Sequence, residues 1–473
     1  IMFRTGHSPI KEKMKEIDSP LSGEMSGHVC YADDFYGYDD ALYVGLRLLR
    51  IIANEKKSLN VDVLNGMLEG VERSEAIDIG LRVIVEGRQA CLSSSDVREE
   101  SLEKMVTRSL SMAREAPVDK DIVLATNDQL VSAQELEVLD LIDTEVMVEA
   151  DRLEKWAIEA EVEARKVKGI TQVQGSSASV GIIKSRLAFS NGFSQGYSRS
   201  GVNISCVSIS GQGNKMERDY ASESRVHISD LPSPSSIGQL SGDRAAARFG
   251  ARKPPTGNYP VLYDERVSSS LVGHLIGAIN GASIVRGSSW LLQNLGEEIF
   301  SKNISIKECP LKVRCSGSRP FDAEGLKTNT KNIINNGILE TWLLDLSSSQ
   351  NLGLESTGNA VRSVSSPPSP GISNISLIGG LKSRDYLIKE MGTGLLVTSM
   401  IGLTLNPITG DYSRGASGYW VENGEVKYPV NECTLAGNLK EMLKTIIPAN
   451  DSKRHLSFSV PSLLVQGLKI AGK

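Results

Sequence analysis

The chain has 473 residues, a length that suits two or three domains rather than one core. Hydrophobic residues make up 40% and aromatic residues only 5%, while 44 glycines favour short strands and tight turns over a helical bundle. The net charge of −5, without a run of Lys and Arg interleaved with aromatics, argues against a nucleic-acid partner. No apolar run reaches the roughly 18–20 residues that span a bilayer, so we expect a cytoplasmic chain without a membrane partner.

The six cysteines are widely scattered, and no C-x-x-C pair is present. Cys309 and Cys315 are the closest two, with five residues between them. A zinc knuckle would need tighter pairs than these. We therefore interpret the cysteines as reduced thiols with a structural role.

The first part of the chain predicts an extension, then a helix, then a meander of strands. Residues 1–37 are polar and rich in Gly, Ser and Asp, so we expect them to be poorly ordered or docked as an atypical extension. Apolar residues at helical spacing predict a helix within 39–57. Residues 59–96 alternate apolar and polar residues and are broken by "NG" and "EG", which predicts short antiparallel strands. The "SSSD" at 93–96 is expected to cap a helix that Pro117 closes.

The middle of the chain predicts another helix followed by further strands. Residues 134–167 contain a long charged amphipathic helix, whose charges we interpret as a solvated face. Residues 170–226 return to strand patterning. Residues 228–256 hold a Pro/Ser-rich link, a short helix and the break "RKPPTGN", so the main domain boundary should lie near there.

The last part opens with the strand "YPVLYD" and a helix that carries His274, and "NNGILETWLL" and "ENGEVKYPV" indicate hairpins. A Pro/Ser loop at 363–374 should lie on the surface or over a cleft. We therefore expect an α+β protein with a mixed N-terminal region of antiparallel strands and long helices over 38–230. A β-rich C-terminal domain is expected over 231–473. A break near 118–133 leaves open whether the N-terminal region is one subdomain or two.

His274 is the first candidate for a functional residue. A zinc-binding helix places two histidines at i and i+4, because that spacing points both rings the same way. Here those positions hold Ala278 and Ser270, and no carboxylate is adjacent. A packed or hydrogen-bonded histidine is therefore favoured over a metal ligand. The chain also has no G-x-S-x-G elbow and no phosphate-binding G-x-x-x-x-G-K-[ST] loop, so no catalytic residue is predicted.

Two polar clusters admit either a structural or a functional interpretation. They are "MERDYASES" at 216–224 and "TGDYSRGASGYWVENGEV" at 409–426. The structural interpretation is turn chemistry with a local Asp–Arg pair, and the functional one is a groove wall that holds a peptide backbone. The candidate contacts with a peptide or partner are His274, Arg286, Ser288, Asp411, Tyr412, Ser413 and Arg414.

Several stretches resemble the TldE (PmbA) branch of the TldD/PmbA family. They are "GVERSEAIDIGLRVIVEGRQACLSSSD", "MERDY", "GHLIGAINGASIVRGSSWL", "SRPFDAEGLKT", "GILETWLLDLSSSQNLGLESTGNA", "MGTGLLVTSMIG", "GDYSRGASGYWVENGEVKYPVNECTLAGNLKEM" and the final "IAG". They recur in order from about residue 59 to 473, whereas the first 58 residues are far less typical.

The resemblance implies that this chain lacks the metal site of its sister branch. TldD is a zinc metallopeptidase with an HExxxH helix and a further cysteine ligand near its C-terminus. Alignment on that helix puts Val272, Gly273 and Gly277 where the first His, the Glu and the second His would be. The last cysteine here is Cys433, and Gly418 stands where the metal-bearing branch has a Glu. No cofactor is therefore expected on this chain, and zinc is expected in a TldD-type partner.

The resemblance also implies a role as the non-metal subunit of a cytoplasmic TldD–TldE metallopeptidase complex that cleaves unfolded or extended peptides. Roles in the family include peptide maturation and antitoxin turnover, and an older label is "modulator of DNA gyrase". On this interpretation the chain is inactive in proteolysis alone and forms a homodimer without its partner. One alternative is a non-proteolytic homo-oligomeric adaptor for a protein such as gyrase. Another is an independent hydrolase with an unrecognised site.

Overall fold

The computed structural model describes residues 21–23, 29–31 and 53–473, except 137 and 191. Strands β1 (Leu21–Gly23) and β2 (Val29–Tyr31) form an antiparallel pair within the predicted N-terminal extension. The rest of that extension and most of the helix predicted within 39–57 lie outside the described residues. The described end of that helix prediction, from Ala53 to Lys57, is wrong, because these residues begin a long strand.

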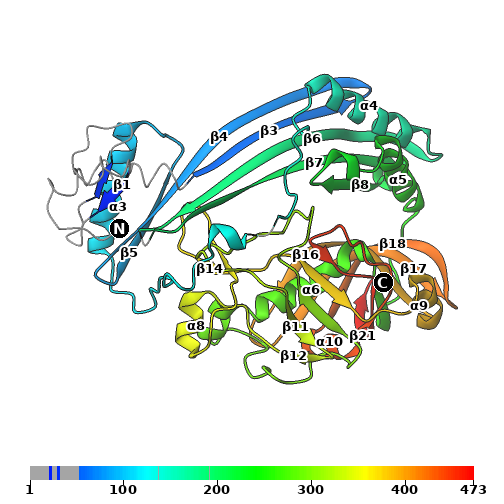
Figure 1. The fold of residues 1–473 in the computed structure, drawn as a ribbon. Helices are drawn as coiled ribbons and strands as arrows, with labels where there is room; N and C mark the ends of the chain where they lie inside the picture. The colour runs from blue at the N-terminus through cyan, green and yellow to red at the C-terminus, as the bar shows by residue number, and fades with distance from the viewer. Residues whose placement is uncertain (1–20, 24–28, 32–52, 137, 191) are drawn as a thin grey trace.

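A six-stranded antiparallel sheet, here called the long sheet, arches over the rest of the molecule (Figure 1). Its strands in spatial order are β5 (Arg88–Ser94), β4 (Met67–Val85), β3 (Ala53–Leu64), β6 (Ile170–Ala188), β7 (Ser194–Ser210) and β8 (Glu217–Arg225). The predicted hairpins are confirmed at Asn65–Gly66 and Glu86–Gly87. All four of these residues have a positive φ, which the tight turns between twisted strands require.

Three helices pack on the long sheet. Helix α3 (Glu99–Glu115) lies on β4 and β5 and ends before Pro117, as predicted. Its N-cap residue is Arg98, and Asp96 instead accepts hydrogen bonds from the Arg98 backbone N–H and the Ser101 hydroxyl. Helices α4 (Ala150–Lys166) and α5 (Pro234–Ala247) cover one face further along the sheet and bury alanines and aliphatic residues against it.

The solvated charge face predicted for α4 has one exception, Glu161, which is fully buried. Its carboxylate accepts hydrogen bonds from the backbone N–H groups of Asn65 and Gly66, each at 2.8 Å, and pairs with Arg165 at 2.6 Å. A buried carboxylate is tolerated when its oxygens are satisfied in this way. Glu161 thus ties α4 to the β3–β4 turn.

The C-terminal region contains a sheet that closes on itself. Its order is β18-β17-β16-β9-β21-β19, and an additional β18–β21 pairing completes a ring of five strands. The strands are β9 (Gly257–Tyr263), β16 (Gly394–Leu405), β17 (Asp411–Glu422), β18 (Glu425–Asn438), β19 (Ile447–Pro448) and β21 (Leu463–Ala471). The predicted hairpin at Asn423–Gly424 is confirmed, again with a positive φ at both residues.

A second, smaller sheet and five helices complete this region. The sheet contains β12 (Ile338–Leu339), β11 (Lys331–Asn335), β10 (Ser305–Glu308), β15 (Ile375–Ile378) and β20 (Phe458–Ser459), and β13 (Ala360–Val361) pairs with β14 (Ser369–Pro370). The helices are α6 (Glu265–Ala278), α7 (Gly281–Val285), α8 (Leu346–Leu352), α9 (Arg384–Met391) and α10 (Leu439–Thr445). The largest core lies between the ring, α6 and the second sheet.

The structure confirms the expected α+β class, with mixed helices and strands and a sheet-rich C-terminal part. Helix α5 packs on β7 and β8, so the chain leaves the long sheet only over residues 248–256. The sequence-based division between 230 and 231 falls before this helix. The five cysteines with described side chains are unpaired thiols. No helix of the described residues is long and apolar enough to cross a membrane.

Candidate functional site

Helix α6 places His274 between the core and an open surface. Asp264 caps the helix by accepting a hydrogen bond from the Arg266 backbone N–H. Leu271, Val272 and Leu275 are buried against the core. His274 is half-buried at the border of this apolar face, as the sequence pattern predicted.

His274 packs against Tyr412 of β17 and feels the charge of Arg414 on the same strand. We call these three residues the His274–Tyr412–Arg414 cluster. The His274 and Tyr412 rings meet edge to face with their centroids 5.6 Å apart. The buried Tyr412 hydroxyl donates to the sulfur of Met400 on β16 at 3.6 Å. Arg414 Nε donates to the carbonyl oxygen of Gly402 at 2.8 Å.

The cluster holds His274 in its neutral form at pH 7. Burial, and then the positive charge of Arg414, lower the pKa of His274 below its ordinary value. Its Nε2 atom is buried and has no hydrogen-bond partner among the described residues. A neutral, packed imidazole of this kind suits a structural or contact role.

The structure separates the other predicted contacts from this cluster. Asp411 and Ser413 alternate with Tyr412 and Arg414 along β17, so they lie on its opposite face. Asp411 is exposed and accepts hydrogen bonds from Thr409 and Asn438, which lower its pKa. This arrangement matches the turn-chemistry interpretation for Asp411, and no ion pair joins it to Arg414 in the part of the chain that the structure describes.

Arg286 and Ser288 lie just beyond α7. Arg286 is exposed and occupies the C-cap position of that helix. The Ser288 hydroxyl donates to the Ser283 carbonyl oxygen at 3.3 Å. Among the described residues, no hydrogen bond or ring contact links either side chain to the His274–Tyr412–Arg414 cluster. A role for the seven candidates in binding a peptide or a partner stays a prediction.

The residues present on α6 do not fit a zinc ion. Val272 is buried in the core and has no donor atom, while Gly273 and Gly277 are exposed glycines. A Cβ atom at either glycine would meet nothing within 4 Å, so both face open space. At Gly418 a Cβ atom would lie 1.9 Å from the Leu396 carbonyl oxygen, which leaves no room for a carboxylate side chain there. Within the described residues, no group of three or more His, Cys, Asp or Glu residues could hold a metal.

The "MERDY" cluster joins the two halves of the molecule, which the sequence did not indicate. Asp219 on β8 pairs with Arg266 on α6 at 2.6 Å and with Arg248, after α5, at 3.7 Å. Arg248 also donates to the Ser417 hydroxyl on β17 at 3.0 Å. The predicted local Asp–Arg pair is therefore wrong, since both partners come from later segments. We call Asp219, Arg248 and Arg266 the interdomain latch.

The Asp219 carboxylate of the latch is paired despite its burial, whereas Arg248 Nε is buried without a hydrogen-bond partner among the described residues. Burial alone would raise the pKa of Asp219, but the hydrogen bond and charge of Arg266 outweigh it and the pKa lies below its usual range. The Arg266 guanidinium also lies 5.2 Å from the centre of the Tyr220 ring. Next to the latch, Asn431 donates to Glu217 at 2.6 Å. Sequence periodicity carries no signal for contacts of this kind, because the partners are far apart along the chain.

Comparison with known protein families divides most of the chain into three successive domains. Residues 50–113 match the PmbA/TldA metallopeptidase domain 1, 142–249 the central domain, and 256–472 the C-terminal domain. Residues 1–67 match a different family, the α/β/α domain III of phosphoglucomutase and phosphomannomutase. This second match covers the segment that is atypical in the sequence.

Individual relatives agree with the three-domain match. The chain is 35% identical to Metalloprotease PmbA of Escherichia coli O157:H7 over 428 residues, which cover 89% of this chain and 92% of the relative. A crystal structure from Bacteroides thetaiotaomicron, of a protein described in relation to modulation of DNA gyrase, superposes with a TM-score of 0.83. The two are 26% identical, and the match covers 92% of this chain and 98% of that one.

A crystal structure of TldE from Thermococcus kodakarensis shares the fold. Its TM-score is 0.79 at 19% identity, and the match covers 91% of this chain and 99% of that one. The order of the matched domains and the extent of the PmbA match together decide the assignment. This chain belongs to the PmbA/TldD family.

Proposed function

We propose that this chain is the non-metal subunit of a cytoplasmic metallopeptidase complex, in which a TldD-type partner carries the zinc. The complex would cleave unfolded or extended peptides. The observation that carries the proposal is the donor set of α6, where Val272 faces the core and Gly273 and Gly277 supply no side-chain ligand. Membership of a family whose members are named metalloproteases supports a role in proteolysis.

The open strip of α6 supports a substrate-facing role for this subunit. Gly273 and Gly277 leave the helix backbone uncovered beside the half-buried His274. An extended peptide can approach such a surface closely, whereas a grip on its backbone by strand addition requires an exposed strand edge elsewhere in the molecule. A backbone grip is tolerant of sequence, which suits unfolded substrates of varied composition.

The proposal is tested by zinc content and casein cleavage, measured on the purified chain alone and after co-purification with a TldD-type protein. We expect no bound zinc and no cleavage for the chain alone, where it forms a homodimer. The complex should contain about one zinc per pair of subunits and should degrade casein. Zinc on the isolated chain, or casein cleavage at stoichiometric strength without the partner, would refute the proposal. A stable complex that contains zinc but spares casein would favour a non-proteolytic adaptor.

A further inference from the structure

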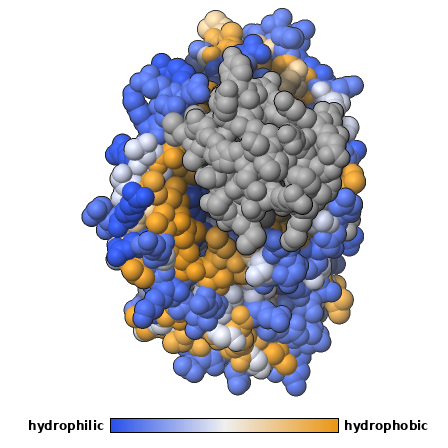
Figure 2. Space-filling view, turned by 60° about the vertical axis from the view of Figure 1, so that its left-hand side comes forward, coloured by the Kyte–Doolittle hydropathy of each residue, from blue (hydrophilic) through white to orange (hydrophobic). Residues whose placement is uncertain are grey.

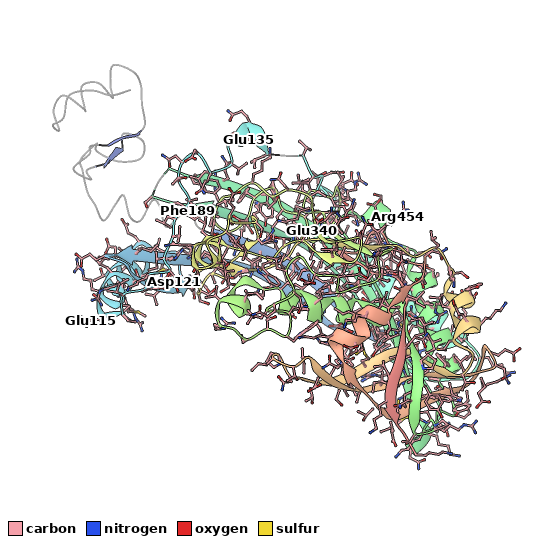
Figure 3. The ribbon with its side chains drawn as sticks, turned by 90° about the horizontal axis from the view of Figure 1, so that it is seen from below. Glu115, Asp121, Glu135, Phe189, Glu340 and Arg454 are labelled. Atoms are coloured by element: carbon pink, nitrogen blue, oxygen red, sulfur yellow. The ribbon has the colours of Figure 1, made fainter. Side chains whose placement is uncertain are left out.

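A cavity lies between the long sheet and loops of the C-terminal region, and none of its lining residues belongs to α6. Its volume is about 280 Å³. Most of its wall is apolar, with contributions from Leu81, Ile84, Val123, Phe189, Leu346 and Pro368. Arg82 on β4 and Arg362 after β13 also line it, so we call it the Arg82–Arg362 cavity. Seen from below, Phe189 lies towards the end of the molecule that carries Asp121 and Glu115 (Figure 3).

Within the described residues the two arginines form no direct ion pair, and Asp119 and Asp345 act on Arg82 only from a distance. Arg82 Nε donates to the Gln89 side chain at 2.9 Å, and Arg362 Nε donates to the Ser366 carbonyl oxygen at 3.0 Å. Neither guanidinium forms an ion pair within the described ranges, and Arg362 Nη2 is buried without a hydrogen-bond partner. Burial lowers the pKa of both groups, and the charge of Arg82 lowers that of Arg362 further. Two half-buried cations of like charge are unfavourable unless an anion joins them.

The acidic groups nearest Arg82 are engaged elsewhere. Asp119 accepts a hydrogen bond from Gln89 Nε2 at 2.8 Å, and Asp345 accepts one from the Ser348 backbone N–H at 2.9 Å at the start of α8. Glu324 accepts from the Leu346 backbone N–H at 2.8 Å. Burial, and then the charge of Asp322, raise the pKa of Glu324 to about 8, so its carboxyl is protonated at pH 7. The cavity wall therefore carries net positive charge.

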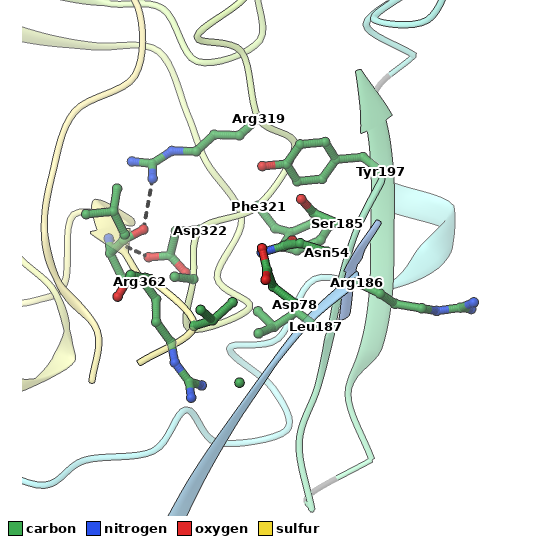
Figure 4. Close-up of a pocket in the computed structure, with 16 residues that line it drawn as sticks. Asn54, Asp78, Ser185, Arg186, Leu187, Tyr197, Arg319, Phe321, Asp322 and Arg362 are labelled. Atoms are coloured by element: carbon green, nitrogen blue, oxygen red, sulfur yellow. Dashed lines mark hydrogen bonds between the residues drawn. The ribbon is translucent and has the colours of Figure 1, made fainter. Parts of the chain in front are cut away.

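A neighbouring cavity of about 270 Å³ shares Arg362 and Ala323 with the first (Figure 4). Its buried Asp322 is held by backbone hydrogen bonds, whereas Arg319 Nε and Nη2 are buried without a hydrogen-bond partner among the described residues. Asp322 accepts backbone hydrogen bonds from Glu324, Leu326 and Ala360. Arg319 donates to the Ala360 carbonyl oxygen at 2.9 Å.

The neighbouring cavity reaches the strands of the long sheet through Ser185 and Tyr197. Figure 2 brings this side of the molecule forward and shows apolar surface bordering a hollow. The Pro/Ser loop contributes Val364 to one cavity and Pro368 to the other, which confirms its predicted position over a cleft.

We propose that the Arg82–Arg362 cavity binds the C-terminal carboxylate of a peptide whose last residue is apolar. The planar guanidinium groups match a carboxylate in shape and charge, and Arg is the residue best suited to such paired hydrogen bonds. The apolar wall receives the terminal side chain, and the volume, at the small end of ligand pockets, suits one or two residues. The preceding residues extend into the neighbouring cavity. This site is separate from α6 and independent of any zinc-bearing partner.

The test is fluorescence anisotropy of the full chain with a labelled peptide that ends in Ala-Ala-Leu. The free acid should bind, and the same peptide with a C-terminal amide should bind at least about tenfold more weakly, because it loses the charged hydrogen bonds. Arg362→Gln and Arg82→Gln should each weaken binding of the acid by about tenfold or more. The affinity of Arg362→Lys should lie between those of the parent and Arg362→Gln, because lysine keeps the positive charge but lacks the forked pair of N–H donors.

The matched control is Arg108→Gln, which removes an exposed arginine of α3 outside both cavities and should leave binding unchanged. Thermal unfolding of every variant shows whether it is folded. Equal affinity for acid and amide, no binding of the acid, or unchanged binding by folded Arg362→Gln would each overturn the proposal. An amidated peptide with an internal Glu that binds as tightly as the acid would also overturn it, since the anion would then be a side chain. None of these outcomes bears on the zinc and casein experiment.

Discussion

At the residue scale, the environment rather than the residue type decides what each polar group does. His274 has no second histidine one helical turn away in the sequence, and its ring packs on Tyr412 while its Nε2 lacks a hydrogen-bond partner among the described residues. Glu324 lies in "FDAEGLKT", which has no feature that marks it, yet burial and neighbouring acids raise its pKa to about 8. The sequence could place His274 at the edge of an apolar face. It could not indicate the state of Glu324, because that depends on groups from other segments.

We predict that Glu324→Gln changes how stability depends on pH. The unfolded carboxyl ionises near pH 4.5, whereas the folded one keeps its proton until about pH 8. The folded chain therefore loses stability as the pH rises through this window, by about 3–5 kcal/mol from this group. Glutamine has no proton to lose, so urea unfolding should show the variant more stable than the parent at pH 9 and closer to it at pH 5. The control Glu298→Gln changes an exposed residue and should match the stability of the parent at both pH values. If stability depends on pH in the same way for Glu324→Gln and the parent, the raised pKa of Glu324 is contradicted.

At the element scale, strands β16 and β17 approach each other so closely that only glycine fits at one position. A Cβ atom at Gly418 would lie 1.9 Å from the Leu396 carbonyl oxygen and 2.9 Å from the Leu396 carbonyl carbon. The β16–β17 register shifts directly after this point, between Val397 and Ser399, so the approach belongs to an irregularity in the ladder. The sequence marks the β17–β18 hairpin through Asn423–Gly424 but does not mark this contact.

Gly418→Ala is therefore expected to lower the free energy of unfolding by about 3 kcal/mol or more, because the strands must separate to admit the methyl group. The matched control is Gly277→Ala on α6, where a Cβ atom meets nothing within 4 Å. That change should stabilise the chain by about 0.5–1 kcal/mol, since alanine restricts the unfolded chain and favours the helix. Chemical denaturation of the two variants decides the matter. Equal midpoints for Gly418→Ala and the parent would show that the strands are not packed so tightly.

At the scale of the whole molecule, the interdomain latch fixes the long sheet to the C-terminal region. Asp219 has 5% of its side chain exposed, and its two arginine partners are nearly as buried. Removing one member of a buried pair leaves the others without a counter-charge, which costs more than the pair contributes when intact. The latch therefore matters most for how the two halves are held together.

We predict that Asp219→Asn lowers the free energy of unfolding by about 3–5 kcal/mol at pH 7. The connection over 248–256 should also become more sensitive to limited proteolysis. The folded pKa of Asp219 is depressed, so its stabilisation is present above pH 3.8, its ordinary pKa, and is lost as the pH falls through the lower folded value. The difference between parent and variant should therefore shrink in acid. Asp243→Asn, an exposed change on α5, is the control, and an equal effect of the two changes would argue against the latch.

The sequence by itself determined the hairpin turns, helices α3 and α4, and the family. Hairpins at Asn65–Gly66, Glu86–Gly87 and Asn423–Gly424 follow from turn pairs that end in glycine. Helix α3 follows from the polar run before it and Pro117 after it, and α4 follows from its amphipathic pattern. Only the tertiary structure decided that Asp219 pairs with Arg266, that Arg82 and Arg362 line one cavity, and that Gly418 admits no side chain. The physical reason is range. Turn and helix preferences act between near neighbours in the chain, whereas ion pairs, cavities and close strand contacts depend on residues that only the folded chain brings together.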